Sequence, residues 1–274
     1  MAGVIGKSMQ VPLGRRIVYD FLHASMSVPT VAIQKNMNVA ELFSARQRAR
    51  VRPSWMSIFT KAYAKTAAAT PELRQVFLTF PWQRMFEYAR PTADIVIEAS
   101  VNGAPTLVTV PLQAPDTMPL LAMDQHLVAC KEKPVERVRQ FQRAMFLARF
   151  PALLRRWVWW YILNASGPKR ARYFSTFGVT SVGNWGVDSL RPLAPWTSLL
   201  HFGAIGADGV ITMRLTYDHR VLDGSAPSKA LIEMERILQT EILAELRSLG
   251  ETPDQRTLWS SWADTVQVGI SEPS

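Results

Sequence analysis

Segments in which apolar and polar side chains alternate, or in which β-branched residues cluster, predict the strands of this chain. The clearest is 93–101, where Ile95 and Ile97 alternate with polar neighbours before Asn102-Gly103, a dipeptide typical of a tight hairpin. We expect the return strand at 106–111. The other predicted strands cover 28–34, 75–80, 85–88, 174–181, 198–205 and 210–217.

Other segments carry apolar residues at the spacing of a helix, and the longest of them covers 225–249. Asn38 followed by Glu41 has the form of a capping box and predicts a helix that ends before Pro53. Helices are also predicted at 15–24, from Ser54 to Ala69, and over 119–163 with breaks at Pro134 and Pro151. Strands and helices follow one another without regular strand–helix–strand repeats, which favours an α+β domain.

The composition fits one globular domain. With 274 residues, 48% of them hydrophobic, the chain can bury one substantial core, and we expect a domain over 14–250 between tails at 1–13 and 251–274. A single cysteine, Cys130, excludes an intrachain disulfide and fits a reducing compartment. The N-terminus lacks the apolar core of a signal peptide, and no apolar run has the length of a membrane-spanning helix. We therefore expect a cytoplasmic protein.

The net charge of +9 is concentrated in one segment. Between Arg137 and Arg172 there are nine basic residues and no acidic residue, and the rest of the chain is balanced. Such a segment predicts an anionic partner: a phosphate-bearing cofactor, an acidic carrier protein or an anionic membrane surface. Nucleic acid is not expected, because no nucleic-acid motif accompanies the charge.

An apolar stripe lies within the same segment. Phe146, Phe150, Leu153, Leu154, Trp157, Trp160 and Tyr161 fall on one predicted helical arc over 146–163, beside Arg149 and Arg156. Such a face either packs against the core or a partner subunit, or lies in a membrane interface, where tryptophan, tyrosine and arginine are favoured. The second interpretation implies a lipid-like acyl chain or acceptor.

The segment 216–224 brings together the most chemistry in the fewest residues. It places His219 between two carboxylates, Asp218 and Asp223, and before a glycine that allows a sharp turn. An imidazole at a strand end can act as a general base at physiological pH. The alternative is a buried histidine that only ties a strand to a helix.

This segment, Thr-Tyr-Asp-His-Arg-Val-Leu-Asp-Gly, resembles the DHRxxDG signature of the 2-oxoacid dehydrogenase acyltransferases and the HxxxDG pattern of the related chloramphenicol acetyltransferases. Further segments are similar to that family in the same order, so the resemblance runs from Gly14 to Leu249. They are Val28-Pro29, 57–62 with 70–73, 94–97 and 176–183.

The resemblance implies a chloramphenicol acetyltransferase-like fold, with a mixed sheet flanked by helices, that assembles as a homotrimer or a larger assembly of trimers. It implies an acyltransferase in which His219 is the general base and Thr180 the oxyanion donor, with Ser181 as the adjacent alternative. The domain over 14–250 would then be a free-standing catalytic domain, without the lipoyl and subunit-binding domains of that family. In the family the histidine of one protomer faces the hydroxyl residue of its neighbour, so we expect a shared site.

The matching carboxylate of the chloramphenicol acetyltransferases forms a structural ion pair with an N-terminal arginine. The resemblance therefore gives Asp223 a supporting role in the site, paired with Arg15 or Arg16. The family assigns no role that we can derive to Asp218 and Arg220.

The acyl donor implied by the resemblance is a pantetheine thioester, either coenzyme A or the phosphopantetheine arm of an acyl carrier protein, and no metal is expected. We assign donor binding to Ser181, Asn184, Trp185 and Gly224, since the glycine-containing loop after Thr180 borders the expected channel. The acceptor is a hydroxyl, an amine or a thiol.

Two alternatives to this function remain open at the level of the sequence. The chain could be a non-catalytic scaffold or regulatory relative of the dehydrogenase core, or a transacylase that serves a separate lipoylated protein. The presence of both His219 and Thr180 favours an enzyme, because a scaffold need not keep either residue.

Overall fold

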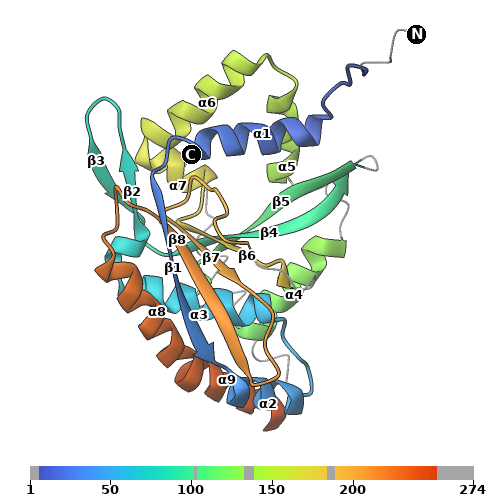
Figure 1. Ribbon diagram of the computed structural model, residues 1–274, viewed down its shortest axis with the longest axis vertical. Coiled ribbons are helices and arrows are strands. Elements are labelled where there is room, and N and C mark those ends of the chain that lie inside the picture. Colours follow the sequence, from blue (N-terminus) through green and yellow to red (C-terminus); the bar gives the residue numbers. More distant parts are fainter. Residues whose placement is uncertain (1–5, 102–103, 133–138, 184–188, 252–274) are drawn as a thin grey trace, which may run out of the picture.

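Six strands form one mixed sheet, which is the centre of the domain (Figure 1). The computed structural model describes residues 6–101, 104–132, 139–183 and 189–251. The strand order is β1 (Thr30–Asn38), β8 (Val210–Asp218), β7 (Ser198–Phe202), β6 (Phe177–Thr180), β4 (Thr92–Val101) and β5 (Ala104–Gln113). The pairs β7–β6 and β6–β4 are parallel and the other three are antiparallel, as expected for a mixed sheet.

One face of the sheet, here called the inner face, carries the main core. Side chains alternate between faces along a strand, and Phe177 and Val179 of β6 point into this core. Tyr63 crosses from the covering helix and donates a hydrogen bond to Ser198 of β7 at 2.8 Å. The helices of this side are α2 (Ala40–Arg48), α3 (Trp55–Ala69), α4 (Leu120–Glu132), α8 (Ser225–Ile237) and α9 (Leu243–Glu251), with a π-helical turn, Leu238–Ile242, between the last two.

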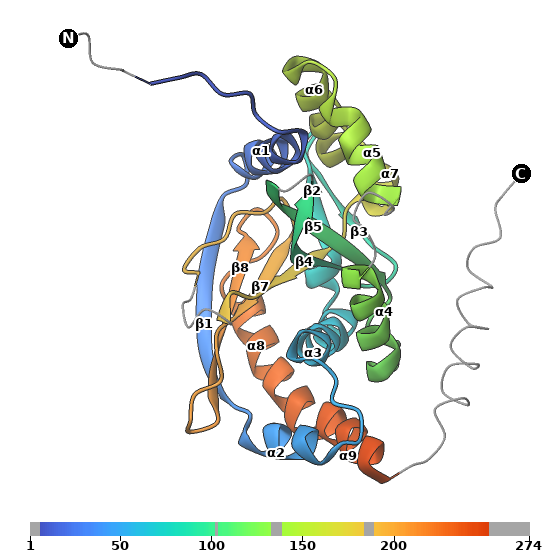
Figure 2. The same cartoon turned by 90° about the vertical axis from the view of Figure 1, so that its right-hand side faces the viewer.

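The outer face is covered by a second group of helices, which lie together at the top of the molecule in both views (Figures 1 and 2). They are α1 (Leu13–Ser25), α5 (Arg139–Ala148), α6 (Ala152–Asn164) and α7 (Gly167–Tyr173). Asp20 of α1 accepts two hydrogen bonds from Arg155 of α6, at 2.7 and 3.1 Å, and both side chains are buried. Breaking one partner of such a buried pair costs about 3–5 kcal/mol, so this pair fixes α6 to α1.

A short hairpin stands beside the sheet. It consists of β2 (Gln75–Leu78) and β3 (Arg84–Glu87), preceded by the 3₁₀ turn Pro71–Arg74. Thr197, just before β7, donates a hydrogen bond to the carbonyl of Gln75 at 2.5 Å, which attaches the hairpin to the sheet.

The expected α+β fold and its mixed sheet are confirmed, with boundaries that differ by a few residues. The predicted capping box at Asn38 is wrong, because β1 continues through Asn38 and its carboxamide accepts a hydrogen bond from Ala40 instead. Ser54 does cap α3, accepting from the Ser57 amide at 3.2 Å. The predicted turn at Asn102-Gly103 lies outside the described residues, as do 1–5 and 252–274 of the tails.

The apolar stripe over 146–163 does not form one helical arc. Pro151 ends the first part and α6 begins after it, so the stripe is divided between α5 and α6. Its members do not belong to the buried core of this chain: Leu153 is 80% exposed and Trp157 is 59% exposed. Besides the buried Arg155, the residues of α6 that turn inward include Trp159, which packs on Phe21 and Phe174, and the buried Leu163.

Fewer residues of the basic segment 137–172 are free to bind an anionic partner than its sequence indicates. Arg155 and Arg170 are buried and engaged within the chain, so neither can serve an external anion. Arg143, Arg149, Lys169 and Arg172 are exposed. The anionic partner expected from nine charges must therefore be recognised by fewer of them.

Candidate active site

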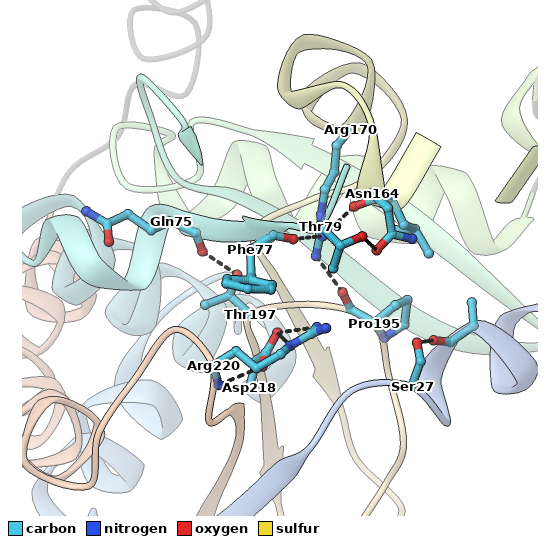
Figure 3. Close-up of polar contacts among 12 residues, drawn as sticks. Ser27, Gln75, Phe77, Thr79, Asn164, Arg170, Pro195, Thr197, Asp218 and Arg220 are labelled. Atoms are coloured by element: carbon cyan, nitrogen blue, oxygen red, sulfur yellow. Dashed lines mark hydrogen bonds and ion pairs between the residues drawn. The ribbon is translucent and has the colours of Figure 1, made fainter. Parts of the chain in front are cut away.

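The turn after β8 is held by a pair of residues within the DHR sequence. Asp218 is 1% exposed and accepts two hydrogen bonds from the Arg220 guanidinium, Nε to Oδ1 at 2.9 Å and Nη2 to Oδ2 at 2.8 Å (Figure 3). Its Oδ1 also accepts from the Arg220 backbone amide at 3.0 Å. The guanidinium lies over the Phe77 ring of the hairpin at 5.1 Å. This clamp, formed by Asp218 and Arg220, fixes the backbone conformation of His219, which lies between the two residues.

Arg170 of α7 supports the same region from the side opposite Asp218, above it in the view of Figure 3. Its guanidinium donates to three backbone carbonyls: Phe77 at 3.1 Å, Leu163 at 2.8 Å and Pro195 at 2.9 Å. Burial lowers the pKa of Arg170, and the nearby Tyr88 and Asp218 partly oppose that effect. Arg170 thus ties the hairpin, the end of α6 and the segment before β7 into one support for the clamp.

His219 itself is fixed by its backbone and open at its side chain. Its amide donates to the Pro29 carbonyl at 2.9 Å, just before β1. Its side chain is 46% exposed, packs edge-on against Tyr217, and places Nδ1 3.8 Å from Asp223 Oδ1. An accessible imidazole on a fixed backbone fits a proton-transfer role, and the side chain is not buried within this chain, unlike the histidine of the alternative interpretation.

The predicted ion pair of Asp223 with Arg15 or Arg16 is not found among the described residues. The Asp223 side chain is 92% exposed, and Arg16 donates instead to the Val11 carbonyl at 3.3 Å. The buried carboxylate of the motif is Asp218, so the structural role assigned to Asp223 falls to Asp218. Gly224 lies in the turn before α8 with a φ of −53°, so this turn does not use the left-handed conformation that favours glycine.

Thr180 is the last residue of β6 and lies at the other end of the sheet. Phe177 and Val179 face the inner core, and so Thr180 faces outward with Gly178. Its register neighbour in β7 is His201, whose Nε2 accepts from the Ser189 amide at 3.2 Å. Within the described ranges the Thr180 hydroxyl forms no hydrogen bond, so it can donate to a substrate oxygen.

Ser181 is the weaker candidate for oxyanion donor. Its hydroxyl donates to the Phe202 carbonyl at 2.8 Å and accepts from the Gly183 amide at 3.2 Å. A Cβ on Gly183 would lie 2.8 Å from the backbone carbon of Gly203, so only glycine fits this turn. Ser181 and Gly183 thus shape the turn beside Thr180.

His219 and Thr180 are not brought together within one chain. In the register of the sheet Thr180 of β6 pairs with His201 of β7, and His201 pairs with Arg214 of β8. His219 follows Arg214 five residues later along the chain. At about 3.3 Å per residue and about 4.8 Å per strand, the two residues are separated by roughly 15–20 Å. The predicted site residues therefore form two candidate half-sites in each chain, one with His219 and Asp223 and the other with Thr180 and Ser181.

A large cavity opens at the Thr180 half-site. It has a volume of about 1270 Å³ and is bordered by the middle of β4, by the ends of β6 and β7 and by α2, α3 and α4. Phe43, Trp55 and Phe59 form a stacked row along it, with centroid distances of 6.0 and 5.4 Å, and the Arg46 guanidinium lies over Trp55 at 5.1 Å. Asn184 and Trp185, assigned to donor binding, lie outside the described residues.

The functions of Asp218, Arg220 and Arg170 were not predicted from the sequence. Asp218 and Arg220 had the motif as a signal, but their roles depend on the hairpin and on the segment before β7. Arg170 had no signal of its own, because its three acceptors are backbone carbonyls, two of them far from it in the sequence.

No protein-family model and no curated protein sequence matches this chain. Solved structures do match. A probable dihydrolipoamide acetyltransferase from Listeria monocytogenes has a TM-score of 0.62 at 15% identity, covering 92% of this chain and 99% of that one. A truncated catalytic core of the 2-oxoacid dehydrogenase complex from Thermoplasma acidophilum has a TM-score of 0.59 at 16% identity, covering 86% and 99%.

A dihydrolipoamide acetyltransferase from Azotobacter vinelandii, with a TM-score of 0.61 at 19% identity, covers 87% of this chain and 95% of that one. Its structure was studied for the catalytic roles of a serine, a histidine and an asparagine four positions after the histidine. His219 and Asp223 have the same spacing in this chain. The chain therefore has the fold of the dihydrolipoamide acetyltransferase catalytic cores, as its DHRxxDG segment led us to expect.

Proposed function

We propose that this protein is an acyltransferase that moves an acyl group from a pantetheine thioester to a hydroxyl, amine or thiol acceptor. The observation that carries the proposal is the state of His219, whose backbone is fixed by Pro29 and by the Asp218–Arg220 clamp while its imidazole is half exposed. A general base needs both a fixed position and access to the proton it removes.

In this proposal His219 takes the proton of the acceptor, which then attacks the thioester carbonyl. The carbonyl oxygen becomes an oxyanion, and the Thr180 hydroxyl donates a hydrogen bond to it. The tetrahedral intermediate expels the thiol, which receives the proton from His219. Asp223 lies beside the imidazole in this step, with its Oδ1 3.8 Å from Nδ1.

The half-sites are complementary only between chains, which supports an assembly in which His219 of one protomer meets Thr180 of another. We propose a homotrimer, alone or within a larger assembly of trimers. A related structure with a TM-score of 0.58 is the cubic core of a pyruvate dehydrogenase complex, which shows that this fold can build large assemblies.

The donor arm is proposed to occupy the cavity of about 1270 Å³ beside Thr180. Its stacked aromatic row and Arg46 suit a nucleotide-bearing thioester such as coenzyme A, and exposed arginines suit an acidic acyl carrier protein. Ser181, Asn184 and Trp185 stay in the proposed donor site, and Gly224, which belongs to the His219 half-site, would join it from the neighbouring chain.

The test is thiol release by the purified protein from acyl-coenzyme A and, separately, from acyl carrier protein, in the presence of alcohol, amine and dithiol acceptors. We expect acceptor-dependent thiol release from at least one donor. The donor with the faster release identifies the carrier of the acyl group as coenzyme A or acyl carrier protein. A correctly assembled protein that releases no thiol from either donor with any acceptor would be a scaffold, and the proposal would be wrong.

We further propose that the protein binds anionic membranes peripherally through the stripe on α5 and α6. Its large side chains are exposed, and Arg149 lies among them. Each basic residue near an anionic surface contributes on the order of 1 kcal/mol. In the part of the chain that the structure describes, no helix has the length and hydropathy to span a bilayer, so this contact is interfacial.

Co-sedimentation with vesicles tests the membrane proposal. The protein should pellet with phosphatidylserine-containing vesicles and not with neutral ones, and replacing Trp157 and Trp160 by alanine should reduce pelleting about tenfold or more. Trp82→Ala is the matched control, because Trp82 is 75% exposed on the hairpin, outside the stripe. Equal pelleting of all variants, or no pelleting of the wild type, would contradict the membrane proposal. The stripe would then be a contact surface for a protein partner.

A further inference from the structure

A second cavity, of about 700 Å³, lies between the outer face of the sheet and the helices α1, α5 and α6. Its volume is in the range that encloses most of a small-molecule ligand. Its walls are largely aliphatic and aromatic. They include Val18, Phe21, Ala144, Leu147, Val158 and Trp159.

The floor of this cavity is the outer face of the sheet. Asp94 is buried there, and its Oδ2 accepts hydrogen bonds from Trp196 Nε1 at 3.0 Å and from the Ser175 amide at 3.2 Å. Burial raises the pKa of Asp94 to about 6. The carboxylate holds the Trp196 ring against Gly178, where a Cβ would lie 2.3 Å from that ring. The floor is thus a fixed apolar surface that continues along β6 to Thr180.

Thr180 borders both cavities, together with Val96 and Leu107. The two cavities differ in chemistry. Charged side chains such as Arg46, Asp124 and Lys131 line the first, whereas the second is lined mainly by apolar groups, with the exposed Arg143, Lys169 and Arg172 at its solvent side. Thr180 therefore stands where a polar channel meets an apolar one.

We propose that the second cavity binds the linear aliphatic acyl chain of the thioester, so that the enzyme transfers medium or long acyl groups. The inference rests on the proposed function. A thioester whose carbonyl lies at Thr180 extends in two directions, its thiol arm into the polar cavity and its acyl chain into the apolar one. Acetyl transfer alone would leave the apolar cavity unused.

Chain length should therefore control affinity. Each methylene that moves from water into an apolar site increases binding about fourfold. Calorimetric titration with acetyl-, octanoyl- and lauroyl-coenzyme A should show affinity rising by at least a hundredfold from the shortest to the longest donor. The titration requires no turnover, and the transfer rates of the same donors are measured separately.

Ala144→Trp places an indole in the cavity from α5, and the ratio of lauroyl to acetyl affinity should fall by at least tenfold. Val158→Phe, from α6, is the second variant if the first does not fold. Ala152→Trp is the matched control, since Ala152 is exposed on α6 and lies outside the cavity, and it should keep the wild-type ratio.

The outcomes separate this inference from the proposed function. Transfer of acetyl groups without any dependence of affinity on chain length would overturn the inference and leave the function standing. Chain-dependent binding without transfer would support the cavity and contradict the function. Binding of a free long-chain alcohol, with acyl donors that bind independently of chain length, would assign the cavity to the acceptor and overturn the proposal.

Discussion

Replacing His219 by alanine is expected to lower the rate of acyl transfer by about 10²–10⁴-fold, the usual contribution of a general base. The protein should stay folded, because the position of residue 219 is fixed by its own amide on Pro29 and by the Asp218–Arg220 clamp, neither of which needs the imidazole. The side chain is 46% exposed, so its removal opens no buried cavity. Thiol release and the melting temperature of the variant measure the two expectations.

His23→Ala is the matched control. His23 is an exposed histidine of α1 that stacks on Tyr19, at 6.2 Å between ring centroids, and it lies outside the proposed site. It should retain wild-type turnover. Near-normal transfer by folded His219→Ala protein would remove His219 from the mechanism.

Much of the fold is contained in local patterns. The alternation over 93–101 and the helical period over 225–249 each predict an element that the structure confirms as β4 and as α8 to α9. These elements were predictable because each buries one face on the same core, so the period of burial appears in the sequence. The observed boundaries differ from the predicted ones where a cap or a turn depends on an adjacent element of the fold. At Asn38, for example, β1 pairs with β8 to its last residue.

The burial and the partners of charged side chains were the least predictable features. Arg155 has its partner Asp20 on another helix, and Arg170 binds carbonyls of the hairpin and of the segment before β7. Asp223 and Asp218 have similar places in the motif, yet one is exposed and the other buried. The Asp218 amide donates to the Thr197 carbonyl at 2.9 Å, and its partner Arg220 packs on the Phe77 ring. Burial of this kind depends on packing between distant segments, which no local pattern records.

The candidate site was predicted as a set of residues and not as a geometry. The resemblance points to His219 in the motif and to Thr180 in the segment 176–183, but only the strand order shows that they lie at opposite ends of the sheet. A separation of roughly 15–20 Å is far beyond hydrogen-bond distance. This separation is the physical argument for a site made by two chains.

Mixed assemblies of His219→Ala and Thr180→Ala chains are expected to recover activity that neither variant has alone. In a ring of three chains that contains both variants, one interface of three pairs an intact His219 with an intact Thr180. Such trimers should therefore show about one third of the wild-type rate. The measurement is thiol release by trimers co-expressed with two different affinity tags and purified through both.

The central claim is that acyl transfer takes place between His219 of one chain and Thr180 of the next, and the doubly tagged trimers test it most directly. Mixing the two purified variants without subunit exchange is the control, and it should stay inactive. Recovery of about one third of the wild-type rate only in the doubly tagged trimers is the predicted result. Doubly tagged trimers of verified composition that remain as inactive as either single variant would contradict the shared site.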